Sequence, residues 1–127
     1  MAAGLIEHVN VTVADPERTA RMLVDLFGWA VRWKGPSALG GHTIHVGTEA
    51  QYLAVYTPEN AIGAYAKAGA KTGGLNHIGV VVDDLDAAET RVQDAGFEPF
   101  SHGDYTPGRR FYFLDADGIE YEVVSYA

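Results

Sequence analysis

The chain has 127 residues, of which 47% are hydrophobic and 20% charged, so it can bury the core of one folded domain. The formal net charge of −8 and the scattered Lys and Arg residues argue against a nucleic-acid surface, which needs a basic stripe. The absence of cysteine rules out disulfides, thiolate nucleophiles and cysteine-ligated zinc. No segment has the length and apolarity of a signal peptide or membrane span, so we expect a cytoplasmic protein without a membrane partner.

The first half of the chain predicts one helix among four strands. We expect a strand at 5–13, a helix at 16–27, and further strands at 29–34, 42–47 and 51–56. Asp15 and Pro16 suit the start of the helix, because Asp can cap it and Pro fits its first turn. Gly28 suits the position that follows the last helical residue.

The second half repeats this order. We expect a strand at 75–82, a helix at 85–95, and strands at 97–102, 109–114 and 119–125. The segment IEHVNVTVADPE aligns with LNHIGVVVDDLD, which places His8 on His77 at an offset of 69 residues (77 − 8). From Gly28 and its counterpart onward we take the offset as a constant 68, so that Ala54 falls on Glu122 (122 − 54).

Each half therefore predicts a β-α-β-β-β module of the α+β class. We expect a single domain over 1–127, in which modules 1–57 and 74–127 are joined by a linker at 58–73 with room for one short helix. The two modules are expected to close edge to edge into a half-barrel cleft.

Strand alternation selects the side chains that face away from the helices. The valines of the first strand are predicted to pack on the helix, which leaves His8 on the opposite face. By the same alternation His77 and Glu122 point to the concave side of their sheet. Two imidazoles and a carboxylate are a minimal ligand set for an open divalent-metal site. The competing interpretation is that these are two unrelated strand histidines and a solvent-facing carboxylate.

Other side chains on the expected cavity face are candidates for contacting a substrate: Asn10, Tyr52, Ala54, Tyr56, His42 and Arg110. The two tyrosines would donate hydrogen bonds or stack on a ligand, although core packing is an equal alternative. The offset of 68 turns His42 toward the cavity and His45 away from it. Arg110 either clamps a substrate carboxylate or phosphate or lies on the surface.

These segments together resemble the vicinal oxygen chelate superfamily, which includes glyoxalase I, extradiol dioxygenases, fosfomycin-resistance proteins and bleomycin-resistance proteins. The likeness covers nearly the whole chain and rests on IEHVNVTVADPERTARMLVDLFGW, NHIGVVVDDLDAA and RRFYFLDADGIEYEV. The resemblance implies metal ligands at His8, Ala54, His77 and Glu122. Alanine cannot ligate a metal, so the remaining three are similar to the ligand set of extradiol dioxygenases and fosfomycin-resistance enzymes.

The resemblance implies a divalent-metal-dependent enzyme that acts on a small oxygen-rich substrate, with an extradiol-type dioxygenase as the first hypothesis. Tyr112, ten residues before Glu122, is then the expected catalytic group. Fe²⁺ or Mn²⁺ is the favoured metal, with Zn²⁺ or Ni²⁺ as alternatives, and family analogy implies a homodimer. The alternative functions are a metal-free protein that sequesters a small molecule, as bleomycin-resistance proteins do, and a glyoxalase-like lyase or isomerase.

Overall fold

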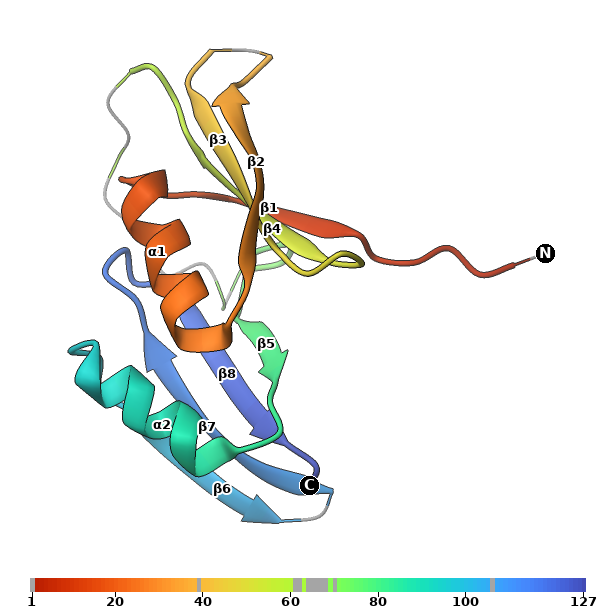
Figure 1. Cartoon of the computed structure of the whole chain (residues 1–127), viewed down its shortest axis with the longest axis vertical. Coiled ribbons are helices and arrows are strands. Elements are labelled where there is room, and N and C mark those ends of the chain that lie inside the picture. Colours follow the sequence, from red (N-terminus) through yellow and green to blue (C-terminus); the bar gives the residue numbers. More distant parts are fainter. Residues whose placement is uncertain (1, 39, 61–62, 64–68, 70, 106) are drawn as a thin grey trace. The chain divides into compact units, whose positions relative to one another are not determined.

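The computed structural model describes residues 2–38, 40–60, 63, 69, 71–105 and 107–127 (Figure 1). The chain divides into two compact units, Met1–Gly63 (unit 1) and Ala64–Ala127 (unit 2). The expected linker spans the boundary between these units. Its residues 61–62, 64–68 and 70, where a short helix was expected, lie outside the described residues.

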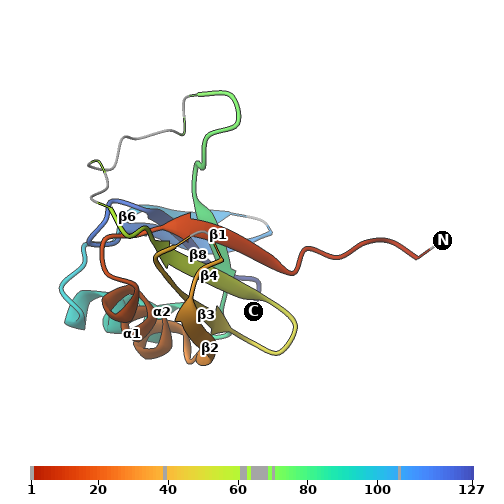
Figure 2. The same ribbon diagram turned by 90° about the horizontal axis from the view of Figure 1, so that it is seen from above.

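Unit 1 is a four-stranded mixed sheet with one helix. Its elements are β1 (His8–Thr12), α1 (Pro16–Phe27), β2 (Ala30–Pro36), β3 (His42–Gly47) and β4 (Tyr52–Thr57). The strand order is β1-β4-β3-β2, in which β1 runs parallel to β4 and the other pairs are antiparallel. The helix packs on β3 and β4 and covers one face of this sheet (Figure 2).

Local chemistry explains where α1 begins and ends. The Asp15 carboxylate accepts a hydrogen bond from the Arg18 backbone N–H (3.2 Å), and Pro16 occupies the first turn. Gly28 follows the helix with φ of 69°, a left-handed conformation that a residue without Cβ adopts freely. Between these ends Leu23 and Leu26 are buried, and each such side chain contributes roughly 1.5–3 kcal/mol by leaving water.

Unit 2 has the same architecture. Its elements are β5 (Ile78–Val81), α2 (Leu85–Asp94), β6 (Phe100–Tyr105), β7 (Gly108–Leu114) and β8 (Glu120–Ser125), with strand order β5-β8-β7-β6. The Asp84 carboxylate caps α2 by accepting from the Ala87 backbone N–H at 3.0 Å. The fully buried core includes Phe111, Phe113 and Tyr121.

The predicted α+β class and the repeated β-α-β-β-β order are confirmed. Several strands begin later than expected, and β1, β5 and β6 each begin three residues late. Leu5 and Ile6 precede the paired part of β1 and are 91% and 83% exposed. Of the valines predicted to pack on the helix, Val11 and Val13 are buried, whereas Val9 is 40% exposed.

Candidate functional site

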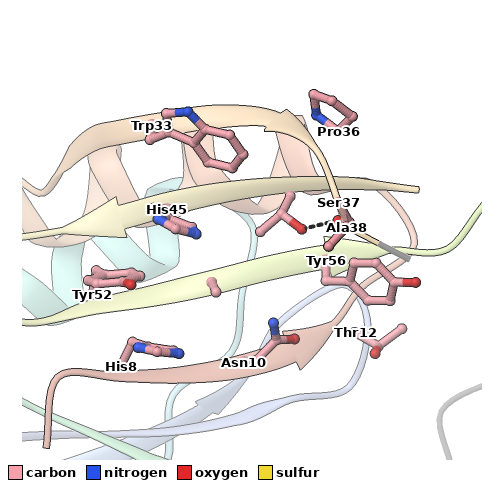
Figure 3. Close-up of a pocket in the computed structure, with 12 residues that line it drawn as sticks. His8, Asn10, Thr12, Trp33, Pro36, Ser37, Ala38, His45, Tyr52 and Tyr56 are labelled. Atoms are coloured by element: carbon pink, nitrogen blue, oxygen red, sulfur yellow. Dashed lines mark hydrogen bonds between the residues drawn. The ribbon is translucent and has the colours of Figure 1, made fainter. Parts of the chain in front are cut away.

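The open face of the unit 1 sheet carries a groove of about 720 Å³ (Figure 3). Six residues of unit 1 were expected on this face, and all but His42 line the groove: His8, Asn10, Tyr52, Ala54 and Tyr56. Their sequence neighbours in β4 point the other way and are buried in the core. The sheet thus separates a core face from a groove face, and these five candidates lie on the groove face.

The expected orientation of the two histidines in β3 is wrong. His45 lines the groove, whereas Nε2 of His42 lies 4.0 Å from the Glu17 carboxylate of α1, on the other face. The reason is turn length. Paired Gly47 and Tyr52 are separated by four residues (48–51), but the corresponding pair in unit 2, Leu114 and Glu120, is separated by five (115–119). The offset between the halves is therefore 67 in β3, and not 68, which makes His45 the counterpart of Tyr112.

A row of aromatic rings crosses all four strands of the groove face (Figure 3). The His8 and Tyr52 rings stack with centroids 4.9 Å apart, Tyr52 and His45 stack at 4.6 Å, and His45 lies 5.0 Å from the Trp33 indole. The indole lies over Gly35, where an added Cβ would approach it to 2.8 Å. The aromatic row is defined as these four rings. His8 and His45 cover the two sides of the Tyr52 ring from the flanking strands β1 and β3, so these rings pack on one another and turn their edges toward the groove.

The aromatic row contains two residues that strand alternation missed, His45 and Trp33. The cause for Trp33 is a β-bulge, since the pairing of β2 with β3 shifts between Val31 and Trp33. An unbulged strand would turn this indole toward the helix. The residue types in β2 do not indicate a bulge, so the orientation of Trp33 was not predictable from alternation alone.

Glu7 organises the edge of the groove. Its Oε1 accepts hydrogen bonds from His8 Nδ1 (2.9 Å) and from the Tyr52 hydroxyl (3.2 Å). These bonds hold the pKa of Glu7 below its ordinary value, while desolvation and the adjacent carboxylate raise the pKa of Tyr52. Partial burial, and then the nearby His8 and Arg32, lower the pKa of His45. His45 is therefore a neutral imidazole at pH 7, able to donate or accept a hydrogen bond.

Unit 2 pairs a histidine with a carboxylate on the corresponding face of its own sheet. His77 Nε2 lies 3.4 Å from Glu122 Oε2, and His77 Nδ1 lies 2.7 Å from the Asn76 side-chain oxygen. The other carboxylate oxygen, Oε1, accepts from the Tyr112 hydroxyl (2.9 Å) and from the Arg110 guanidinium (3.1 Å). Burial alone would raise the pKa of Glu122, but these two hydrogen bonds and the nearby imidazole outweigh it and lower that pKa.

The structure therefore places Tyr112 and Arg110 around Glu122. Both side chains hold the carboxylate from one side, and the Arg110 side chain is only 14% exposed. This position makes them positioning residues for Glu122, a role that differs from the predicted catalytic phenol and substrate clamp. Those two predicted roles stay predictions.

The two halves repeat the same arrangement around their histidines. In each, the preceding residue accepts a hydrogen bond at Nδ1, Glu7 for His8 and Asn76 for His77. A bond at Nδ1 fixes the ring and leaves Nε2 as the lone-pair donor, as for histidines that ligate metals. Because the carboxylate of Glu7 and the amide oxygen of Asn76 accept hydrogen bonds, Nδ1 of each ring must carry the proton.

The donor set fits a divalent cation. His77 Nε2 and Glu122 Oε2 are adjacent donor atoms. The other polar atom of each side chain, Nδ1 of His77 and Oε1 of Glu122, is already hydrogen-bonded, as is usual for side chains that ligate metals. Among the residues that the structure describes, no group of three or more His, Asp or Glu side chains gathers within one unit. The predicted set takes its third ligand, His8, from unit 1 and stays a prediction.

Ala54 occupies the place that Glu122 has in unit 2. Ala54 pairs with Asn10 and with His45 across the sheet, just as Glu122 pairs with Gly79 and with Tyr112. Its methyl group contributes an apolar patch to the groove where a carboxylate would otherwise stand. His8 in unit 1 therefore has an alanine at the sheet position where His77 in unit 2 has Glu122.

Known structures share this fold at low sequence identity, and no curated protein matches the sequence significantly. The chain is similar to a glyoxylase/bleomycin resistance protein/dioxygenase domain from Frankia sp. EAN1pec, with a TM-score of 0.80, 20% identity and 98% of each chain covered. It is also similar to the fosfomycin resistance protein FosX from Listeria monocytogenes complexed with Mn(II) and sulfate, with a TM-score of 0.70, 17% identity, and coverage of 98% of this chain and 93% of that one.

A third similar structure is TnmS3, an antibiotic binding protein from Streptomyces sp. CB03234, with a TM-score of 0.70, 19% identity and 98% of each chain covered. Neither α1 nor α2, the helices that the structure describes, has the length and hydropathy of a membrane span. The family model described as the Glyoxalase/Bleomycin resistance protein/Dioxygenase superfamily matches residues 7–113, most of the chain, and the protein belongs to that superfamily.

Proposed function

We propose that the protein is a divalent-metal-dependent enzyme that acts on a small, flat, oxygen-bearing substrate. Its proposed metal ligands are His8, His77 and Glu122. The observation that carries the proposal is the His77–Glu122 pair, whose Nε2 and Oε2 atoms lie 3.4 Å apart while their outer atoms are hydrogen-bonded. A carboxylate and an imidazole held in this way are poised to ligate a cation and not merely to pair with each other.

Three protein ligands leave coordination positions open, which a catalytic metal requires. Imidazole and carboxylate donors favour Fe²⁺ or Mn²⁺, and they also accept Zn²⁺ or Ni²⁺. The similarity to FosX, which was solved with Mn(II), supports a divalent ion of this kind. When bound, such an ion supplies Lewis-acid polarisation of the substrate oxygens.

The remaining groups of the site bind and orient. Tyr112 and Arg110 hold Glu122 in position through Oε1. The aromatic row lines the groove, and the neutral His45 within it can exchange a hydrogen bond with a substrate hydroxyl. The carboxylate of Glu7 holds both His8 and Tyr52 in place.

Extradiol-type ring cleavage is the first reaction to test, because it requires three protein ligands and a planar dihydroxylated substrate. Protein reconstituted anaerobically with Fe(II) and then mixed with catechol and oxygen should consume oxygen, and a Glu122→Gln variant should not. Oxygen uptake that is equal in the two proteins would refute the dioxygenase proposal. Lyase or isomerase turnover by the Mn²⁺ or Zn²⁺ form would instead support glyoxalase-like chemistry.

A second candidate function is metal-free binding of a small planar molecule. The groove of unit 1 favours it, since the groove is lined by the aromatic row and by polar side chains such as Asn10, and it can hold a molecule without a metal. The similarity to TnmS3, an antibiotic binding protein, points in the same direction. Equal affinity of a planar ligand for chelator-treated and Mn(II)-loaded protein would favour this function, whereas a large gain on loading would favour the enzyme.

We also propose that the protein is a cytoplasmic homodimer. β1 and β5 are edge strands of their sheets, and each carries an exposed apolar residue, Val9 at 40% and Val81 at 65%. Exposed apolar edges of this kind favour pairing with another strand. Sedimentation equilibrium should give twice the chain mass, and a Val81→Lys substitution should shift the mass toward the monomer; a monomeric wild type would contradict the proposal.

A further inference from the structure

The groove of unit 1 changes in chemistry from one end to the other (Figure 3). One end carries the aromatic row. At the other end four side-chain hydroxyls gather, from β1, β4, β3 and the turn that follows β2, and we call them the hydroxyl row: Thr12, Tyr56, Thr43 and Ser37. Strand pairing explains the row, because Tyr56 pairs across the sheet with Thr12 on one side and with Thr43 on the other.

The hydroxyl row lies well away from the proposed metal ligand of unit 1. Thr12 and His8 point to the same face of β1 and are four residues apart (12 − 8), which corresponds to about 13 Å at a rise of roughly 3.3 Å per residue. Asn10 lies between them and adds its amide to the same face. A ligand that reaches from His8 to the hydroxyl row must therefore be elongated, and a single six-membered ring is too short.

The hydroxyl row can both donate and accept hydrogen bonds. Ser37 and Thr43 are hydrogen-bonded to each other, which uses one of their two hydroxyl hydrogens and leaves the second for a ligand. The Tyr56 hydroxyl donates to the backbone oxygen of Gly40 (3.4 Å), so the phenol oxygen can still accept. Such a mixture of donors and acceptors matches a ligand group that has both, as a hydroxyl or a carboxamide does.

No charged side chain accompanies the hydroxyl row. Among the residues that the structure describes, the groove lining contains no Lys, Arg, Asp or Glu. A ligand carboxylate at this end would lose hydration without gaining an ion pair, whereas a neutral polar group loses less and finds hydrogen-bond partners. The formal charge of −8 on the whole protein disfavours an anion further.

We propose that the hydroxyl row binds an uncharged hydroxyl or carboxamide group at the end of the substrate that lies far from the metal. The substrate class is therefore an elongated molecule that carries its metal-binding oxygens at one end and a neutral hydrogen-bonding group at the other. This inference deepens the proposed function, because it rests on the groove being the place where the substrate binds.

Calorimetric titration with three catechols that differ at the end of one side chain tests the inference. The probes are 3-(3,4-dihydroxyphenyl)propanamide, the corresponding propanoate, and 4-(3-methylbutyl)catechol, which is an apolar analogue of the same shape. Wild-type protein, both chelator-treated and Mn(II)-loaded, should bind the propanoate at least about tenfold more weakly than the amide.

Two variants separate hydrogen bonding from packing. Tyr56→Phe and Thr43→Val each remove one hydroxyl and should weaken binding of the amide roughly 2- to 10-fold, with no change for the apolar analogue. Thr57→Val is the matched control, because Thr57 follows Tyr56 in β4 and does not line the groove. This control should bind all three probes as the wild type does, and a thermal melt establishes that each variant is folded.

No binding of the amide, a propanoate affinity equal to that of the amide, or equal losses for the amide and the apolar analogue in both variants would overturn the inference. Titration of the same preparations with Mn(II) alone keeps the two proposals apart. Mn(II) binding without a preference for the amide refutes the role of the hydroxyl row only. An amide preference that depends on Tyr56 and Thr43 in protein that binds no Mn(II) refutes the metal site only.

Discussion

Removing the Asp115 carboxylate should loosen the turn that joins β7 to β8 and positions Glu122. Asp115 is 8% exposed, and its Oδ1 accepts the backbone N–H groups of Asp117 (2.9 Å) and Ile119 (3.0 Å). Its Oδ2 accepts the Tyr121 hydroxyl at 3.3 Å. The Asp115 carboxylate thus accepts hydrogen bonds from three donors in this turn. The turn leads directly into β8, which carries Glu122.

The magnitude follows from what each donor loses in Asp115→Ala. The Ile119 N–H lies in a residue that is 2% exposed, and an orphaned buried N–H costs about 1–3 kcal/mol. The bonds from Asp117 and Tyr121 are worth about 0.5–1.5 kcal/mol each. We therefore expect a loss of about 3 kcal/mol in the free energy of unfolding. Asp115→Asn keeps an acceptor oxygen and should lose only about 1 kcal/mol.

The cost of Asp115→Asn should also depend on pH. Burial raises the pKa of Asp115 above its ordinary value, although the hydrogen bonds that it accepts oppose this shift. An acid whose pKa is raised by folding stabilises the folded state fully below its unfolded pKa, about 3.9, and loses that contribution as pH rises through the folded pKa. Asparagine lacks this contribution, so the variant should be more destabilised relative to wild type at pH 4 than at pH 7.

Urea denaturation followed by circular dichroism at pH 4 and pH 7 measures both effects. The argument fails if the alanine variant is no less stable than the asparagine variant, because the hydrogen bonds to the side-chain oxygen would then contribute nothing to stability. It also fails if the difference between wild type and Asp115→Asn is smaller at pH 4 than at pH 7. Either result would mean that the turn is stabilised by something other than the buried carboxylate.

Two further predictions concern the site directly. Tyr112→Phe removes the 2.9 Å bond to Glu122 and should weaken Mn(II) binding about tenfold in calorimetry with little change in melting temperature; unchanged affinity would contradict the positioning role. Gly35→Ala places a Cβ 2.8 Å from the Trp33 indole, so the indole must move and the Trp fluorescence should shift. Gly4→Ala, which meets nothing within 4 Å, is its control, and equal behaviour of the two variants would refute the packing argument.

The fold was predictable because short-range signals in this sequence agree with one another. Asp15 and Gly28 mark the two ends of α1, and both make the capping contacts that their residue types suggest. The repeated strand–helix order then assigns the same module to unit 2. The strand ends were less predictable, because Leu5 and Ile6 have the composition of a strand but no partner strand beside them.

The groove was only partly predictable, since two local irregularities change which residues face it. A turn that is one residue shorter after β3 than after β7 reverses the expected orientations of His42 and His45. A β-bulge in β2 adds Trp33 to the groove face and places Arg32 over Tyr52. Register shifts of one residue move a side chain to the opposite face, and their causes lie in pairing geometry, not in residue type.

Binding of Mn(II) to the wild type and to single-ligand variants tests the proposed metal site most directly. Titration calorimetry should give one ion per site, with affinity reduced at least about 100-fold in His77→Ala and likewise in His8→Ala, which lies in unit 1. His102→Ala removes an exposed histidine paired with Glu89 and should bind as the wild type does. Retention of wild-type affinity after loss of His77 or His8, or no binding by the wild type, would contradict the proposed site.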